Sequence, residues 1–528
     1  MDSIKHRRTD APPTGSARLI RARPYLAAFA LAAAAGACTA VLDFTECTEN
    51  KDCAVYFFDN VPMICNEEKQ RCEVKSDGCA HRSECAGLGE DYICGLTGAC
   101  VDISDGYEYC DKPAYPDDTS PVVYVGSIVD REHEASVERG VQLAIDQFNA
   151  MASLPGDTKV ARIACDSGGD AGVASDAAAF LAGSENSAGA LAIVGPADDS
   201  EFRRVVEQVT LSEGVFVYTI SPTAVVQDFA KEDTNAVVWH GRPAAARTGR
   251  AMVDRMADLA PASILCIVRN DAYSNAIFSY MNIGEPNAPW IDVATASAQA
   301  FQQYVDTDAG SITEAVASAL ESLPDPEVVL ILGQGEVGAI ITELAAQAAA
   351  LPTTILVPGR AEPGLVEAVA SHSGLLDAVE LIAPAAPASV ERFDQFAALY
   401  QDKFGGAPDY DAARAYDATL LTLFGMAGTQ APIRGPKITN TVIGRLSAGA
   451  PINLADPNTF AGGVSDLVGG GNVDLEGVMG PLNIDSTNHD VCGDLGAFKV
   501  NGASQPALAQ EAVYSVACPG EAGSWSSN

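Results

Sequence analysis

The sequence predicts an α/β protein with two lobes, each built on a doubly wound parallel sheet, preceded by a small disulfide-rich segment. Three observations predict this architecture. Short β-branched runs alternate with amphipathic stretches after residue 121, the alternation comes in two sets, and most of the 14 cysteines lie before residue 101. Continuous apolar runs separated by helices are typical of parallel strands that are covered on both faces.

Each set of alternating elements predicts one lobe, and the segment Trp239–Asp258 separates the two sets. In the first set we expect strands at 121–126, 160–164, 190–194 and 215–220, and helices at 137–150 and 201–211. In the second set we expect strands at 263–268, 328–332 and 353–357, and helices around 276 and at 337–350. A cleft between two such lobes is the usual place for a ligand.

Length, composition and charge narrow the function further. The 528 residues exceed the roughly 250–300 that one core supports, so more than one domain is expected. The net charge of −38 repels nucleic acid and anionic lipid surfaces, so neither is expected as a partner. After the first 40 residues, no apolar run reaches the roughly 18 residues that a membrane helix needs.

Residues 1–37 have the layout of a signal peptide, with Arg18, Arg21 and Arg23 before the apolar run 25–37. The ending Ala-Gly-Ala-Cys38 resembles the cleavage site of bacterial lipoproteins, which implies that Cys38 is lipidated and that residues 38–46 form a tether. The alternative is an ordinary cleaved signal. The resemblance implies an exported lipoprotein that is anchored to a membrane and faces the periplasm or the cell surface.

Two cysteine-rich modules follow, at 47–72 and 79–100. Their candidate disulfide cysteines are Cys47, Cys53, Cys65, Cys72, Cys79, Cys85, Cys94 and Cys100. Modules this small need cross-links to fold, but four cysteines allow three pairings in each module. Zinc is the alternative, yet these modules have no CxxC pair and only one histidine, His81, so no metal is expected. The polar, proline-bearing stretch 101–120 has the composition of a linker.

Several stretches after residue 121 carry a family resemblance. They are Tyr124-Val-Gly-Ser127, Glu138–Asn149, Ala192-Ile-Val-Gly-Pro196, Val217–Pro222, Ala415-Tyr-Asp-Ala418 and Val478–Asp485. In this order and spacing they resemble the type I periplasmic solute-binding proteins, in particular the branched-chain amino-acid receptor family. The resemblance implies that residues 121–520 form a two-lobed domain with three hinge crossings, and that 521–528 are a tail.

The expected crossings are His240–Pro243, Ile382–Pro387 and Met479–Asp485. They place the N-lobe at 121–241 and 385–481, and the C-lobe at 242–384 and 482–520.

The resemblance also points to N-lobe ligand residues in two loops. In the first loop, Ser200 is a candidate ligand contact, although Asp198, Asp199 and Ser200 before a helix also fit the role of N-caps. In the second loop, Thr223 is the candidate, with a simple turn residue as the alternative. The family's hydroxyl at the position of Val225 is missing.

The resemblance places the other candidates on the C-lobe. Tyr273 matches an aromatic residue that packs over the ligand, although a surface aromatic is the alternative. Arg360 stands where the family has the carboxylate that holds the ligand ammonium group, and Glu362 follows two residues later. This substitution argues against a simple branched-chain amino acid as the ligand.

The remaining cysteines divide into pairs and a single thiol. Cys165 matches a family cysteine whose usual partner is absent, and Cys110 is the candidate substitute. Cys492 and Cys518 are expected to pair with each other, and Cys266, inside an apolar strand, is expected to be a buried thiol.

No enzymatic chemistry is expected, and no cofactor. The pattern Gly333-x-Gly335-x-x-Gly338 after a strand has the layout of a dinucleotide site, but the acidic residue expected further on is missing, and tight packing explains these glycines. No HExxH or GxSxG motif occurs. The expected function is capture of a small polar solute, amino-acid-like or otherwise nitrogenous, for delivery to an ABC permease. The alternative is a sensing or recognition lipoprotein that is not coupled to transport.

Overall fold

The computed structural model describes most of the chain after residue 56. The described residues are 57–58, 61–66, 70–74, 79, 82–85, 87–89, 91–95, 99–117, 120–183, 187–221, 226–229, 232–282, 290–359, 363–430, 433–487, 489–501, 507–516, 518 and 523–527. Residues 46–528 belong to one compact unit, and the first unit, with Cys38, lies outside the described residues. None of the helices in the described part combines the length and apolar character that a membrane crossing requires.

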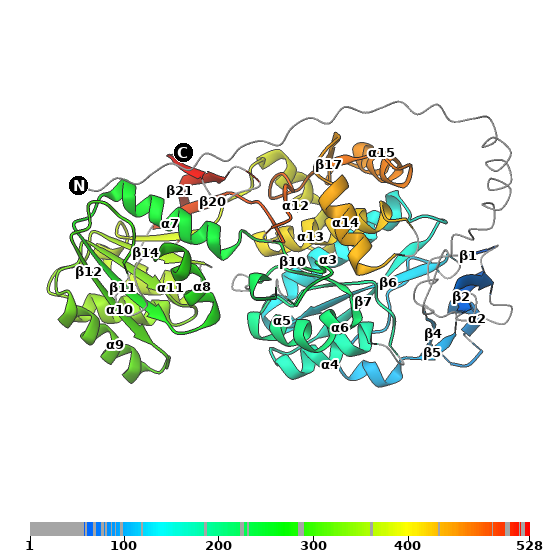
Figure 1. Ribbon diagram of the computed structural model, residues 1–528, viewed down its shortest axis with the longest axis horizontal. Helices are drawn as coiled ribbons and strands as arrows, with labels where there is room; N and C mark the ends of the chain where they lie inside the picture. The colour runs from blue at the N-terminus through cyan, green and yellow to red at the C-terminus, as the bar shows by residue number, and fades with distance from the viewer. Residues whose placement is uncertain are drawn as a thin grey trace, which may run out of the picture. The chain divides into compact units, whose positions relative to one another are not determined.

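The N-lobe contains a seven-stranded sheet with the order β18-β19-β10-β9-β8-β6-β7 (Figure 1). Its strands are β6 (Val122–Val129), β7 (Lys159–Asp166), β8 (Ala192–Val194), β9 (Phe216–Thr219), β10 (Val238–His240), β18 (Ile484–Asp485) and β19 (Asp490–Val491). The strands from β6 to β10 are parallel, as the apolar runs predicted, and their side chains are almost all buried.

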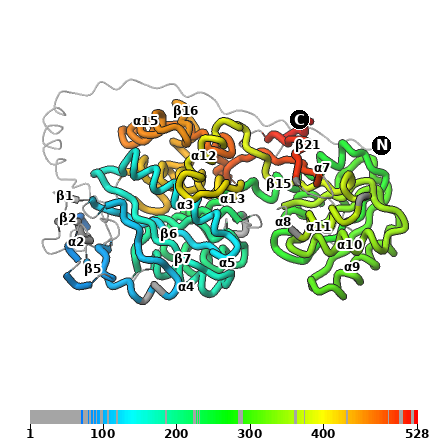
Figure 2. The backbone as a smooth tube through the Cα atoms, turned by 180° about the vertical axis from the view of Figure 1, so that it is seen from behind, coloured from blue at the N-terminus to red at the C-terminus, as the bar shows by residue number. Residues whose placement is uncertain are grey.

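Helices from two distant parts of the sequence cover this sheet. They are α3 (Arg131–Met151), α4 (Ala171–Ala182), α5 (Asp199–Val205), the π-helical turn η4 (Val206–Thr210), α6 (Leu211–Glu213), η5 (Val226–Phe229), α12 (Val390–Phe404), α13 (Tyr410–Ala427), α14 (Gly435–Arg445) and α15 (Pro457–Val468). A small sheet of β16 (Ala450–Asn453) and β17 (Val473–Glu476) lies among the last of them. Figure 2 shows α3 and α13 side by side, and α13 is buried along almost its whole length.

The C-lobe contains an eight-stranded sheet with the order β12-β11-β13-β14-β15-β20-β21-β22. Its strands are β11 (Ser263–Arg269), β12 (Ala298–Tyr304), β13 (Val328–Leu332), β14 (Thr354–Pro358), β15 (Val379–Pro384), β20 (Leu495–Asn501), β21 (Ala507–Val516) and β22 (Gly523–Ser527). Its helices are α7 (Ala245–Leu259), α8 (Ala272–Met281), α9 (Ala309–Ser322), α10 (Val337–Gln347), α11 (Pro363–Ser371) and the short η6 (Ser373–Leu375). Apolar clusters on both faces of each sheet form the cores of the two lobes.

Two predicted boundaries at the end of the chain need correction. The third crossing was expected at Met479–Asp485, but β18 and β19 extend the N-lobe sheet, with His240 in register with Asp490. The chain therefore returns to the C-lobe only at 492–494, and the whole segment 478–494 is called the third crossing below. Residues 523–527, expected to be a tail, form β22, because Trp525 packs on Tyr514 and its indole N–H donates to the carbonyl of Ala251.

The cysteine-rich region folds as short hairpins. β1 (Phe57–Phe58), β2 (Val61–Asn66) and β3 (Arg71–Val74) form one sheet, and β4 (Tyr92–Cys94) and β5 (Cys100–Asp102) form another beside α2 (Arg82–Cys85). In the second module, disulfides join Cys79 to Cys94 and Cys85 to Cys100, which answers the pairing question there. Cys72 is also in a disulfide, while Cys47 and Cys53 lie outside the described residues.

The stretch 101–120, expected to be a linker, is instead docked on the N-lobe. After the turn η3 (Ser104–Glu108), the amide of Asp111 donates to the carbonyl of Ala164, and Ala114 exchanges backbone hydrogen bonds with Arg162. Cys110 forms a disulfide with Cys165 on β7, as the sequence suggested. The expected pair Cys492–Cys518 and the buried thiol of Cys266 are also confirmed.

Candidate functional site

The loops that follow β8 and β9 meet at the carboxyl edge of the N-lobe sheet. The hydroxyl of Thr219 donates to the carbonyl of Pro196 (2.5 Å) and accepts from the amide of Ser221 (3.0 Å). The imidazole of His240 donates through Nε2 to the carbonyl of Ser221 (2.6 Å), and burial lowers the pKa of His240 to about 4, so this donor is neutral. These bonds hold the two loops in fixed positions at the end of the strands.

A small pocket of about 30 Å³ lies at this edge, and we call it the edge pocket. Its lining residues are His133, Glu134, Ser136, Val137, Ala197, Ile220, Arg242, Asp409 and Asp411. Arg242 donates to the carbonyl of Ile220 and to the carboxylate of Asp411, and each distance is 2.6 Å. The charge of Arg242 is therefore already paired with that of Asp411. Glu134 and Asp409 add two further carboxylates, and the edge pocket is therefore acidic.

Glu201, in the first turn of α5, contributes a buried carboxyl group behind this edge. The side chain is fully buried, and neither of its oxygens has a hydrogen-bond partner among the described residues. Burial raises the pKa of Glu201 to about 7; the carboxylates of Asp198 and Glu134 raise it too, while the nearby Ser167 hydroxyl opposes the shift. A carboxyl group held this way is costly to ionise.

Of the predicted ligand residues, Ser200 and Tyr273 lie in the described part. Asp198 is the N-cap of α5, as expected, and its Oδ1 accepts from the amide (2.8 Å) and the hydroxyl (2.6 Å) of Ser200. A ligand role for the exposed Ser200 hydroxyl stays a prediction. Thr223, Arg360 and Glu362 lie outside the described residues, so their roles also stay predictions.

Tyr273 is a buried residue of α8 rather than a surface aromatic, with 6% of its area exposed. Its hydroxyl approaches Gly359, where an added methyl group would lie 3.1 Å from it, directly before the loop that carries Arg360. Burial raises the pKa of Tyr273, and the positive charge of Arg242 opposes this shift. The structure thus brings a C-lobe residue and a residue of the first crossing into one electrostatic neighbourhood.

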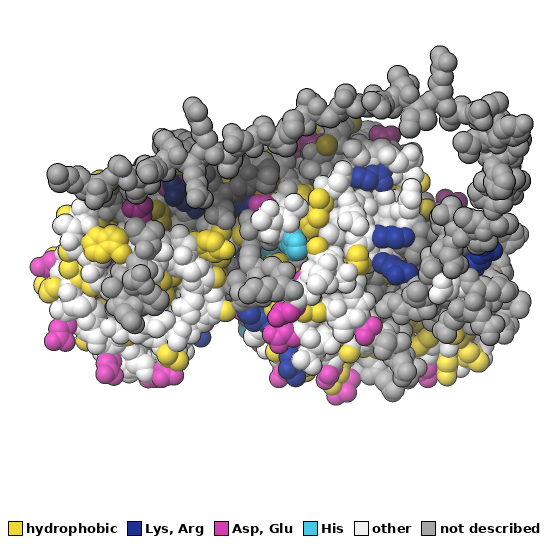
Figure 3. Space-filling model, in the orientation of Figure 1, with side chains coloured by type: hydrophobic (Ala, Val, Ile, Leu, Met, Phe, Trp, Pro, Cys, Tyr) yellow, Lys and Arg dark blue, Asp and Glu magenta, His cyan; other side chains and the backbone are white. Residues whose placement is uncertain are grey.

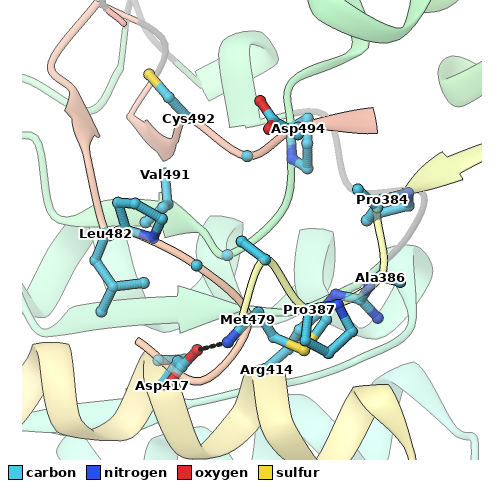
Figure 4. A pocket seen from close by; sticks show the side chains of 18 of the residues that line it. Pro384, Ala386, Pro387, Arg414, Asp417, Met479, Leu482, Val491, Cys492 and Asp494 are labelled. Carbon is cyan, nitrogen blue, oxygen red and sulfur yellow. Dashed lines mark hydrogen bonds between the residues drawn. The ribbon is translucent and has the colours of Figure 1, made fainter. Parts of the chain in front are cut away.

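A larger pocket of about 320 Å³ lies among the three crossings, and we call it the hinge pocket (Figure 4). Its lining residues are Tyr218, Gly241, Pro243, Pro384, Ala385, Ala386, Pro387, Ala388, Arg414, Asp417, Ala418, Met479, Gly480, Pro481, Leu482, Val491, Cys492, Gly493, Asp494, Gln510 and Val513. Figure 4 shows Arg414 and Asp417 projecting from α13, with the second and third crossings above them. Proline, alanine and larger aliphatic side chains are the most numerous residues of the walls, and polar groups contribute a comparable share of the exposed surface.

Asp417 fixes the start of the third crossing. It is 3% exposed, and its two oxygens accept from the amides of Val478 (2.8 Å) and Met479 (2.9 Å). Burial raises the pKa of Asp417 to about 7, and the two amides oppose this shift. Sequence analysis missed Arg414 and Asp417 as site residues. The available signal was three charged residues, Asp411, Arg414 and Asp417, in the first half of a helix whose second half carries no charge.

Arg247 joins the first crossing to the third. Its fully buried guanidinium forms ion pairs with Asp485 and Asp490, both buried, and Asp490 also accepts from the amide of Ala244 (2.8 Å). Asp485, Asp490 and Cys492 are close enough together to hold a metal ion, but Arg247 supplies the cation and Cys492 is in a disulfide.

The Gly333–Gly338 motif is explained by packing. A Cβ at Gly338 would lie 2.4 Å from the carbonyl oxygen of Gly364, and one at Gly333 would lie 2.5 Å from the Tyr304 hydroxyl. The close approach of α10 to its neighbours therefore requires glycine at these positions, as the packing interpretation predicted.

Comparisons with known proteins agree with this architecture. A family model described as "Periplasmic binding protein" matches residues 130–504. No curated protein matches the sequence. Two solved structures illustrate the fold. The branched-chain amino acid transporter substrate binding protein from Streptococcus pneumoniae, in complex with isoleucine, shares 16% identity over 74% of this chain and 99% of its own, with a TM-score of 0.53. A solute binding protein of an ABC transporter from Rhodopseudomonas palustris, in complex with 3,4-dihydroxybenzoic acid, shares 13% identity over 76% of this chain and 99% of its own, with a TM-score of 0.52.

Proposed function

Because this chain belongs to the periplasmic binding protein family, we propose that it is an exported, lipid-anchored receptor for a small nitrogenous solute with a positive charge. The solute binds between the lobes, and the receptor delivers it to an ABC permease. The single observation that carries the charge preference is the edge pocket, in which Glu134 and Asp409 accompany the already paired Arg242 and Asp411.

Electrostatics around the edge pocket support a cationic ligand. Asp130 and Asp198 lie around the same loops, and the chain as a whole carries a net charge of −38. Figure 3 shows acidic side chains gathered along the lower edge of both lobes in that view. A negative field raises the local concentration of cations and disfavours a free carboxylate group on the ligand.

The anchor is the second part of the proposal. Its support is the sequence of residues 25–38, in which a short apolar run ends in Ala-Gly-Ala-Cys38. The Cys38→Ser variant is expected to leave the membrane fraction, with the wild-type chain as the control. Retention of that variant in membranes would contradict lipidation at Cys38.

Titration calorimetry with agmatine, putrescine, lysine and leucine tests the ligand class. We expect an organic cation to bind most tightly, and leucine to bind weakly or not at all. Glu134→Gln and Asp409→Asn should each weaken cation binding about tenfold, which is the loss of about 1.4 kcal/mol from one charge contact. Asparagine at 409 retains the N-cap of α13, so that helix remains intact.

Asp146→Asn is the matched control, because Asp146 is a half-exposed carboxylate of α3 that pairs with Lys403 away from the edge pocket. It should leave all affinities unchanged. Tight binding of leucine, or cation binding that neither pocket variant weakens, would overturn the proposed ligand class.

A receptor for sensing or recognition is the second candidate function. The observation that favours it is the docking of the cysteine-rich region onto β7 through the Cys110–Cys165 disulfide, which presents that region in a defined place. Solute uptake by cells that lack this protein would distinguish the two, because only the transport role predicts a loss of uptake.

A further inference from the structure

The hinge pocket has a distinct chemistry that solute capture at the edge pocket does not use. Its walls come from the three crossings, from α13 and from β21 of the C-lobe. They are formed mainly by proline, alanine and larger aliphatic side chains, with the ring of Tyr218 on the N-lobe side. A volume of about 320 Å³ with walls that are partly apolar and partly polar is suited to a compact organic molecule with one polar end.

Most polar groups on these walls are committed to the backbone. Both oxygens of Asp417 accept amide hydrogens of the third crossing. The side-chain oxygen of Gln510 accepts from the amide of Ala386 (2.8 Å) in the second crossing. Asp494 is exposed to solvent and accepts from the amide of Val516 (3.3 Å). These groups hold the crossings in place and are therefore poorly suited to bind a ligand.

Arg414 differs from these groups, because its partner, the carboxylate of Asp411, also accepts a hydrogen bond from Arg242. Its Nη1 donates to Oδ1 of Asp411 (3.1 Å), the same oxygen that accepts from Arg242 (2.6 Å). The Arg414 side chain is only 10% exposed. Burial lowers its pKa to about 10, and the charge of Arg242 lowers it further. Two guanidinium groups thus share Asp411, and Arg414 brings a cation to the wall of the hinge pocket. The carboxyl group of Asp417 lies on the same wall, and burial raises its pKa to about 7, which weakens its competition for that cation.

We propose that the hinge pocket binds a small carboxylate with a compact apolar body, its carboxylate group on the guanidinium of Arg414 and its body against the prolines of the crossings. Arginine and carboxylate form strong charge-assisted hydrogen bonds, and the apolar part of the walls accommodates the body of the ligand. Such a ligand binds at a site that is separate from the edge pocket and that prefers an anion, whereas the edge pocket prefers a cation.

Occupation of this pocket has a consequence for the lobes. Because its walls belong to the segments that connect the lobes, a bound molecule favours the lobe arrangement in which those walls fit it. The hinge ligand and the cleft solute therefore change each other's affinity by the same factor, as linkage requires.

Benzoate is the probe, and neutral benzamide of nearly the same shape is its control. Saturation-transfer NMR and calorimetry on the full chain at millimolar ligand should show benzoate binding and benzamide binding at least about tenfold weaker. Arg414→Met should weaken benzoate about tenfold or more by removing its cation. Ala386→Leu retains every charged group but narrows the pocket, and should weaken benzoate too.

Arg250→Met is the matched control, because Arg250 is 53% exposed and pairs with Asp254 on α7, away from the hinge pocket. It should leave benzoate binding unchanged, as should Glu134→Gln at the edge pocket. The absence of benzoate binding to the wild-type chain would overturn the proposal, and so would binding that survives both Arg414→Met and Ala386→Leu. Neither result concerns the binding of organic cations, so the two proposals fail separately.

Discussion

The edge pocket and the hinge pocket lie on either side of one carboxylate and have opposite electrostatic character. Asp411 accepts from Arg242 at the edge pocket and from Arg414 at the hinge pocket. On the first side, Glu134 and Asp409 leave an excess of negative charge, whereas on the second the acids are bound to backbone amides and Arg414 remains. The comparison teaches that the net charge of a protein does not fix the chemistry of each site, since a chain with a net charge of −38 places a mostly buried arginine on the wall of a pocket.

The largest effect should follow from removal of the shared carboxylate. Asp411→Ala leaves two poorly exposed guanidinium groups, 6% and 10% exposed, without their common partner. Loss of one partner of a buried ion pair costs about 3–5 kcal/mol, so the free energy of unfolding in urea should fall by about 3 kcal/mol. The same variant should also lose the difference in charge preference between the edge pocket and the hinge pocket.

The control for this measurement is Asp146→Ala, which breaks the exposed pair with Lys403 and should cost less than about 1 kcal/mol. A similar small effect for Asp411→Ala would mean that solvent screens the two guanidinium groups, and the contrast between the pockets would then disappear.

A second measurement asks whether the two pockets are independent of the docked N-terminal region. The double variant Cys110→Ala, Cys165→Ala opens a loop of 55 residues and should lower the free energy of unfolding by about 2–4 kcal/mol. Because the disulfide lies at β7, far along the sheet order from β9 and β10, benzoate affinity at the hinge pocket should remain unchanged. Cation affinity should fall at most slightly, since the start of α3 at the edge pocket keeps its own bond from the amide of Arg131 to Asp166 on β7. Larger changes of either affinity in calorimetry would show that this region shapes the pockets.

The smallest effect concerns the acid behind the edge pocket. The pKa of Glu201 rises from 4.5 to about 7, so between these values the native state retains a proton that the unfolded state has lost, and stability falls as pH rises. Glu201→Gln removes this ionisation and should raise the free energy of unfolding by about 2–3 kcal/mol at pH 8 but hardly at pH 4.5. Urea denaturation at both pH values measures the difference.

The exposed Glu207, in the next turn of the chain, provides the comparison. Glu207→Gln should leave the pH dependence of stability as it is in the wild-type chain. If Glu201→Gln also leaves the pH dependence unchanged, ionisation of the Glu201 carboxyl group costs the native state less free energy than the burial of that group indicates.

Much of the fold follows from patterns in the sequence. The apolar runs at 160–164, 263–268 and 328–332 are strands because a parallel sheet buries both faces, which leaves little room for polar side chains. The disulfide between Cys110 and Cys165 followed from the family resemblance, which matched Cys165 to a paired cysteine and left Cys110 as the candidate partner.

Other features depend on tertiary contacts that local patterns do not contain. β12 at Ala298–Tyr304 is rich in glutamine and lies at an edge of the sheet, where one side needs no burial. The late return to the C-lobe depends on Arg247, a distant cation that allows Asp485 and Asp490 to be buried. The hinge pocket was not predicted, because its residues come together from seven separate stretches of the chain.

The ion pairs of Arg247 restrict how one lobe can turn against the other. Arg247 belongs to the first helix of the C-lobe, and its partners belong to strands of the N-lobe sheet. Any rotation that preserves these bonds must have its axis close to this guanidinium. The first and third connections, which this guanidinium joins, therefore move least when the lobes turn.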